Sequence, residues 1–487
     1  MAEKDIVIPL SKVLIAGDGK TNNKYIKIIE DDDIPILCVN RGMQKKRLMP
    51  FKVLHDNNIN FFQKPGSWEY YLTGESYNKL KEKAIVKHGS WEFEMPWGMK
   101  EPEFKKKDDD IEELDAATAD DIASFGSEYK AINNMTLEEK VSQLNKDRDR
   151  LDEILADPKS FPKNEIAEVL VDTTKNAALV NHAALEDAIH HADDEAKKLT
   201  QGLVDSTHDM IKSSAKLISD DIFGNDLMST LVEKSNGTII QHMTRVYLNG
   251  IAFLAYYNKL ISESSAIQKM RISFASKYRD YYRHLLPHIH GDDIDLERVF
   301  FGGMRVIPPE LFNKWAVGFL IHDIGKGAAV EYHEGEEKYN RQIVIDHVKQ
   351  GYKSIMTKTN YPMEASLITG YHHEYYGDRD GYGYFRAYLT QYKKDNPHAK
   401  PDYCMTYELE PILDYHALAY FPAKVLEIID VYDSVTDPNR VYRKAMKPEE
   451  AINMMREQFV EQHHKIDVVL FDIFSKFIYE KERINKK

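Results

Sequence analysis

An apolar run over residues 319–321 ends in His322-Asp323 and then meets Gly325. The run predicts the end of a buried helix. Adjacent side chains on a helix point about 100° apart, so His322 and Asp323 converge on one centre only if a metal ion lies between them. Gly325 lets the backbone turn, and Lys326 places a positive charge nearby. Taken alone, the same pattern fits equally well an ordinary helix end with a capping glycine and a surface carboxylate.

Length and composition describe a globular protein with room for two or three domains, because the 487 residues are 43% hydrophobic and 30% charged. A net charge of −14 argues against binding DNA, RNA or anionic membranes through bulk electrostatics. A small anionic substrate would need a local pocket of Arg, Lys or metal. Cys38 and Cys404 are the only cysteines, which fits a reducing cytosol. The first residues lack a signal-peptide layout and no apolar run approaches the ~20 residues that span a bilayer, so we expect a cytoplasmic protein.

Sequence patterns predict a mainly α chain in three parts. Residues 1–100 form a small α+β module, because short β-rich runs alternate there with turn signals. Residues 101–220 are an acidic linker followed by a helical connector. The connector either forms a homodimer or folds as a helical hairpin against the next domain. Residues 221–480 carry long amphipathic helices and predict an all-α C-terminal domain.

Histidines and aspartates recur on helical segments of this C-terminal region, where they could reach one centre. The set is His242, His322, Asp323, His347, His372, His373 and Asp430. Imidazoles and carboxylates without thiolates suit iron, manganese or zinc, and do not resemble a structural zinc site. The set is too large for one ion, but the two oxygens of Asp323 could bridge a pair of ions that together clamp a phosphoryl oxygen.

These motifs, in this order, resemble the HD-GYP family of HD-domain metal phosphohydrolases, over about half of the chain (residues 221–470). The family pattern is a helical His, then HDxGK, a His on a following helix, HHE with DGxGYP, and DxxDA with RxYR. The matching segments are His242 to Val246, His322 to Lys326, His347 to Gly351, His372-His373-Glu374, Asp380 to Phe385, Asp430 to Ser434 and Arg440 to Arg443.

The resemblance implies an HD-type helical bundle with a dinuclear site that hydrolyses cyclic di-GMP to linear pGpG, with GMP as a further product, through a metal-bridging hydroxide. It implies two divalent ions, with iron or manganese favoured and zinc as the third option. One ion would be held by His242, His322 and Asp430, the other by His347, His372 and His373, with Asp323 as the bridge. Lys326 would contact the scissile phosphate, and Asp433 would orient a ligand or an arginine. Tyr384, Arg440 and Arg443 would hold the phosphates or guanines.

The chain also departs from the family pattern. Phe385 replaces the final proline, which removes a fixed φ but offers a ring for base stacking. The interval between His242 and His322 is long, which predicts an insertion within 258–310 and makes His290 the alternative ligand to His242. Thr238 stands where members with a third metal carry Glu, so we expect two ions.

Two other functions remain open at this point. The chain could be a receptor that binds cyclic di-GMP without hydrolysing it, or an HD-type hydrolase of another cyclic dinucleotide. The complete ligand set favours the enzyme.

Overall fold

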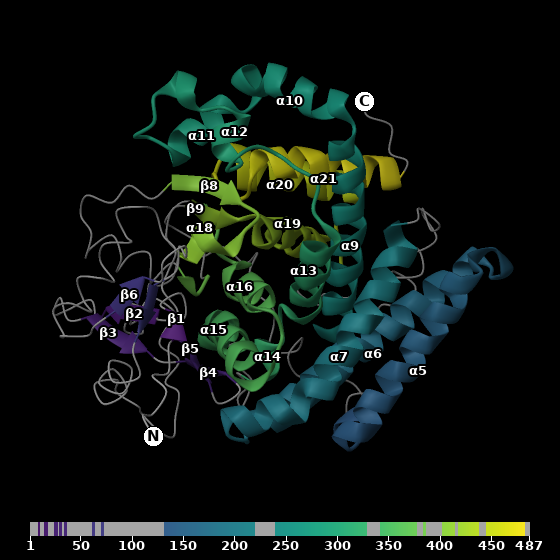
Figure 1. Ribbon diagram of the computed structural model, residues 1–487. Helices are drawn as coiled ribbons and strands as arrows, with labels where there is room; N and C mark the ends of the chain where they lie inside the picture. Colours follow the sequence, from purple (N-terminus) through teal and green to yellow (C-terminus); the bar gives the residue numbers. More distant parts are fainter. Residues whose placement is uncertain are drawn as a thin grey trace. The chain divides into compact units, whose positions relative to one another are not determined.

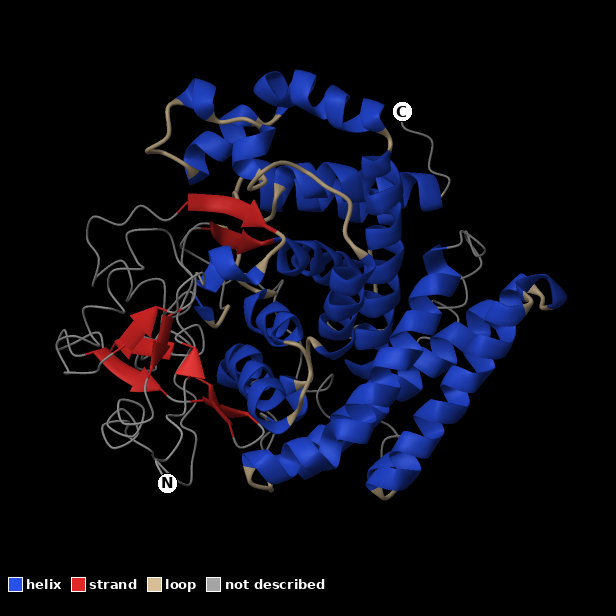
Figure 2. Ribbon diagram, in the orientation of Figure 1, coloured by secondary structure: helices blue, strands red, loops and turns tan. Residues whose placement is uncertain are grey.

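The computed structural model describes residues 131–219, 239–328, 341–376, 383–385, 402–413, 417–437 and 445–482, together with short N-terminal strands. It is mainly helical, as predicted (Figure 2). The chain divides into two compact units, Met1–Phe104 with Thr390–His398 and Lys105–Leu389 with Ala399–Lys487. Among the described residues, no helix combines the length and the apolar character needed to cross a bilayer.

Strands of the N-terminal unit pair antiparallel, in keeping with the β-rich runs of the sequence. β7 (Tyr70–Leu72) lies between β1 (Ile8–Pro9) and β6 (Phe61–Gln63). Two further antiparallel pairs join β2 (Leu14–Gly17) to β3 (Lys24–Lys27) and β4 (Ile29–Asp31) to β5 (Ile34–Ile36).

The connector forms three long helices that pack on one another, α5 (Leu137–Ala156), α6 (Lys163–Ile189) and α7 (Asp193–Ser219) (Figure 1). A reciprocal capping box between Thr136 and Glu139 starts α5. The short 3₁₀ turn η2 (Pro158–Ser160) separates α5 from α6. Helices α6 and α7 also pack against α9, α13 and α15 of the following region. The hairpin alternative is therefore seen, whereas the homodimer stays a prediction.

Helices that carry the predicted ligands form the centre of the larger unit. They are α9 (Ile239–Ser262), α13 (Pro309–Ile321), α15 (Arg341–Lys358), α16 (Met363–Tyr371) and α19 (Phe421–Thr436). Nearly all of α19 is buried, including its charged residues Lys424, Glu427, Asp430 and Asp433. The shorter elements α14 (Gly325–Ala328), α20 (Pro448–Met455), η4 (Arg456–Glu461) and α21 (Val468–Lys481) complete this region.

Residues between α9 and α13, where an insertion was predicted, fold into α10 (Ser264–Lys277), α11 (Arg279–Leu285), η3 (Gly291–Asp293) and α12 (Leu296–Val299). A parallel pair of strands, β8 (Asp402–Thr406) and β9 (Ala417–Tyr420), flanks the short helix α18 (Leu409–Leu413). The prediction of an all-α C-terminal domain was wrong in this detail, because it missed both strands.

A buried histidine in α6 predicts a loss of stability in acid. His182 is 2% exposed, and burial lowers its pKa to about 4. The unfolded chain protonates this residue near pH 6.5, so the free energy of unfolding falls as the pH drops from 6.5 to 4. The difference between the two pKa values corresponds to a loss of about 3 kcal/mol in the free energy of unfolding. We expect His182→Leu to remove this part of the acid sensitivity, measured by urea unfolding at pH 7 and pH 4.5. A variant that loses as much stability as the wild type between these pH values would contradict the assignment.

Candidate metal centre

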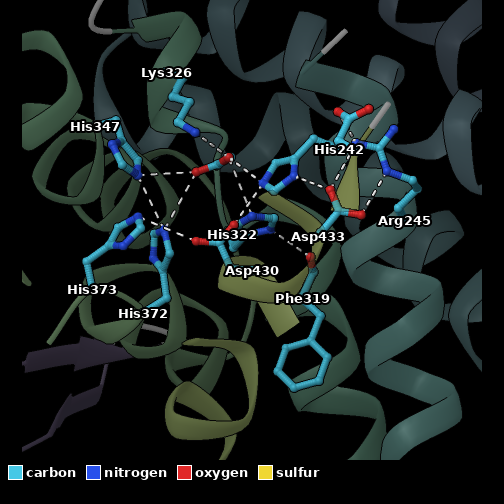
Figure 3. A network of polar contacts seen from close by, with 12 residues as sticks. His242, Arg245, Phe319, His322, Lys326, His347, His372, His373, Asp430 and Asp433 are labelled. Atoms are coloured by element: carbon cyan, nitrogen blue, oxygen red, sulfur yellow. Dashed lines mark hydrogen bonds and ion pairs between the residues drawn. The ribbon is translucent and has the colours of Figure 1, made fainter. Parts of the chain in front are cut away.

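The predicted ligands meet where the central helices converge (Figure 3). His242 lies in the first turn of α9, and His322 and Asp323 directly follow α13. His347 lies in α15, His372 and His373 directly follow α16, and Asp430 lies in α19. All of these side chains are buried. His290, the alternative to His242, is exposed and directly precedes η3.

The ligand atoms fall into two groups. His242, His322 and Asp323 offer atoms that lie within 4.8 Å of one another, and His347, His372 and His373 do the same. We call these the first and the second group. The sequence-based assignment of histidines to two ions follows the same division.

Asp323 lies between the two groups and turns one carboxylate oxygen to each. Its Oδ2 is 3.4 Å from His242 Nε2 and 3.5 Å from His322 Nε2. Its Oδ1 is 3.2 Å from His347 Nε2 and 3.6 Å from His372 Nε2. This geometry is what a carboxylate bridge between two ions requires.

Asp430 also reaches both groups, which the sequence did not indicate. Its Oδ1 is 3.0 Å from His242 Nε2, and its Oδ2 is 3.9 Å from His373 Nε2. The sequence-based prediction assigned Asp430 to the first ion alone, whereas its position would allow it to contact either ion.

Backbone and carboxylate acceptors fix the orientation of the imidazoles. Nδ1 of His322 donates to Phe319 O at 3.0 Å, and Nδ1 of His372 donates to Thr369 O at 2.6 Å. Because the proton is on Nδ1 in each ring, the Nε2 lone pair points to the centre. This is the usual arrangement of metal-binding histidines.

The residues fit divalent ions on two counts. His322 Nε2 is buried without a hydrogen-bond partner among the residues that the structure describes. Buried polar atoms are normally satisfied, so an unsatisfied imidazole nitrogen at this centre indicates a missing partner. Imidazole nitrogens and carboxylate oxygens are also the donor set of iron, manganese and zinc, and leave the choice of metal open.

The protonation states support the same interpretation. Burial lowers the pKa of His322 to about 4 and also lowers the pKa values of His347 and His373, so their lone pairs are available at neutral pH. Burial alone would also lower the pKa of His242, but hydrogen bonds to Asp323, Asp430 and Asp433 raise it to about 10. An ion at His242 therefore has to displace a proton, and its affinity should fall as the pH falls.

A second layer of charged residues holds His242 in place. Asp433 Oδ2 accepts from His242 Nδ1 at 2.8 Å. Arg245 donates to both oxygens of Asp433, at 2.8 and 2.9 Å, and to Asp437 Oδ2 at 2.7 Å. The orienting role predicted for Asp433 is consistent with these contacts. Roles for Arg245 and Asp437 were not predicted, although Arg245 follows His242 by three residues and therefore shares its side of the helix.

We expect Arg245→Lys to lower the affinity of the first group for a metal ion about tenfold. The lysine keeps the buried positive charge but loses the two-pronged contact with Asp433, so the His242 ring is less firmly oriented. The measurement is the chelator concentration that removes half of the bound metal. Arg305→Lys, which affects an exposed ion pair with Glu408, is the matched control. Equal chelator resistance of Arg245→Lys and the wild type would contradict the orienting role.

Of the residues predicted to contact the substrate, only Lys326 is seen next to the histidine groups among the residues that the structure describes. Lys326 Nζ lies 2.7 Å from Asp323 Oδ2, at the edge of the centre. Tyr384 is fully buried beside Tyr352, and Phe385 stacks on Tyr371 with ring centroids 4.3 Å apart. The ring of Phe385 is thus part of the core, not a free surface for a base, and the role of Tyr384 stays a prediction. Arg440 and Arg443 lie outside the described residues.

Comparisons with protein-family models, with curated proteins and with solved structures each found no match to this chain. The functional interpretation therefore rests on the motifs and on the geometry of this centre.

Proposed function

We propose that this chain is a metal-dependent phosphodiesterase that hydrolyses cyclic di-GMP to linear pGpG. The observation that carries the proposal is the position of Asp323, with one oxygen directed to each group of histidines. A carboxylate in that position suits a pair of ions a few ångströms apart, the arrangement used by many phosphodiester hydrolases.

The chain's own residues hold the ions and bind the phosphate. His242, His322 and Asp430 would hold one ion, and His347, His372 and His373 the other, with Asp323 shared. When bound, such ions lower the pKa of water and neutralise charge on phosphoryl oxygens. Lys326 is 8% exposed, so its ammonium meets a phosphate in a partly dehydrated setting where its charge counts for more than in water.

The choice of cyclic di-GMP as the substrate is supported by the motif resemblance. In the segment that corresponds to the family's GYP signature, Tyr384 and Phe385 are packed into the core. Nucleotide binding therefore has to differ from a mode in which the Phe385 ring stacks on a base, which keeps another cyclic dinucleotide as the second candidate substrate.

The test is to incubate protein loaded with Mn²⁺ with cyclic di-GMP, and separately with other cyclic dinucleotides, and to separate the products by chromatography. The proposal expects linear pGpG from cyclic di-GMP. Tight binding of cyclic di-GMP without any product would replace the enzyme with a receptor. Turnover of a different cyclic dinucleotide alone would keep the hydrolase and change its substrate.

A further inference from the structure

All three histidines of the second group depend on one helical hairpin. His347 lies in α15, and His372 and His373 directly follow α16. The turn between these helices, residues 359–362, is fixed by the side chain of Thr359. Its Oγ1 donates to Ile355 O at 2.6 Å and accepts from Tyr361 N at 3.2 Å. The first group is built differently, from α9 and the residues that directly follow α13.

The connector holds the turn of this hairpin through contacts at the end of α15. Thr200 Oγ1 lies 2.9 Å from Lys358 O and also 2.9 Å from Ala196 O of its own helix, so its one proton is shared between these two carbonyl acceptors. Lys358 Nζ in turn pairs with Asp193 at 2.8 Å and donates to His191 O at 2.6 Å. Asn360 Nδ2 donates to Gln201 Oε1 at 2.5 Å.

A buried chain of hydrogen bonds also links the turn to the connector. The hydroxyl of Tyr361, in the turn, donates to Asn181 Oδ1 of α6. Asn181 Nδ2 donates onward to Thr207 Oγ1 of α7 at 3.0 Å. Asn181 is 1% exposed and Thr207 is fully buried, so breaking the chain leaves polar groups without water to replace the lost partner.

We propose that α6 and α7 act as a clamp that sets how tightly the second group binds its ion. Lys358 lies eleven residues, about 16 Å of helix, beyond His347. A helix is stiff, so a tilt of the hairpin at its turn displaces the imidazole at the other end. The residues of the first group, on α9 and directly after α13, are not part of this hairpin. This inference rests on the proposed function, since it assumes that the histidine groups hold metal.

The clamp gives the connector a regulatory role that nothing in the motifs assigns to it. A change that loosens α6 and α7 from the turn would lower occupancy of one ion and leave the other in place. A site that needs both ions would thereby be switched off without unfolding.

The experiment uses the full chain, stripped of metal and titrated with Mn²⁺ alone in a calorimeter. The variant combines Thr200→Val and Tyr361→Phe, which remove two hydroxyls that hold the turn and keep side-chain size. We expect the dissociation constant of one ion to rise about tenfold or more, with the other unchanged. Ser213→Ala is the control, because it removes a hydroxyl by which α7 contacts Asp152 of α5, away from the hairpin. The control should bind both ions as the wild type does.

A second variant assigns the affected ion. His347→Gln should leave one ion, at the first group, and adding the two turn substitutions to it should change that ion's affinity no further. Parallel weakening of both ions, or no change in either, would overturn the clamp while the proposed function stands. A wild-type chain that binds none of Mn²⁺, Fe²⁺ and Zn²⁺ would overturn the proposed function and the clamp with it.

Discussion

Replacing Asp323 with asparagine is expected to remove bound metal and turnover together. The amide keeps the shape of the carboxylate, but it has lost the negative charge and one of the two acceptor oxygens that face the two groups. Stabilisation of transition-state charge by metal ions contributes several kcal/mol, so the rate constant should fall on the order of a thousand-fold. Metal content and the rate of phosphodiester hydrolysis are measured on the same preparation.

Asp467→Asn is the matched control for that substitution. Asp467 is also fully buried, but it accepts from Tyr282 at 2.7 Å and caps α21 instead of facing the histidines. Burial raises its pKa, so a neutral side chain is tolerated better there. The control should keep its metal and its activity. If Asp323→Asn still turned over substrate at the wild-type rate, the bridging role would be refuted.

Gly325→Ala should destabilise the protein by about 3 kcal/mol or more, at the upper end of overpacking substitutions. A Cβ at Gly325 would lie 1.9 Å from His347 O and 2.5 Å from Gly351 N. Both are backbone atoms, so no side-chain rotation relieves the contact and α15 itself has to move. Because α15 carries His347, loss of metal should accompany the loss of stability. The free energy of unfolding in urea and the metal content are the two measurements.

Gly202→Ala adds the same methyl group in a different setting. At Gly202, in α7, the new Cβ would lie 3.7 Å from the nearest atom, an ordinary van der Waals contact. Alanine favours a helix over glycine, so this variant should be more stable by about 0.5–1 kcal/mol. Equal effects of the two substitutions would mean that the close approach of Gly325 to α15 is not what holds the centre together.

Sequence reasoning located the residues that meet at this centre because metal chemistry restricts the choice of candidate ligands. Histidine and carboxylate side chains together suit iron, manganese and zinc, and the pairs His322-Asp323 and His372-His373 stand out at the ends of apolar helices. The structure brings every predicted ligand to one centre, including His242 in place of the exposed His290. Spacing alone could not reveal that Asp430 reaches both groups, since that depends on how α19 packs.

Other features that depend on contacts between distant segments were not predicted. β9 has the sequence Ala-Leu-Ala-Tyr, which carries no β-branched residue, and it forms a strand only because it pairs with β8. The choice between a dimer and a hairpin for the connector depended on which surface its apolar residues meet, and amphipathic spacing gives no partner. The burial of Phe385 against Tyr371 likewise follows from packing of α16, not from the motif.

The number of metal ions per chain, measured by elemental analysis on protein purified without oxygen, tests the central claim most directly. The account predicts about two ions per chain in the wild type, and none in Asp323→Asn. A fully folded wild-type chain that contains no transition metal, and takes none up from Mn²⁺, Fe²⁺ or Zn²⁺, would contradict it.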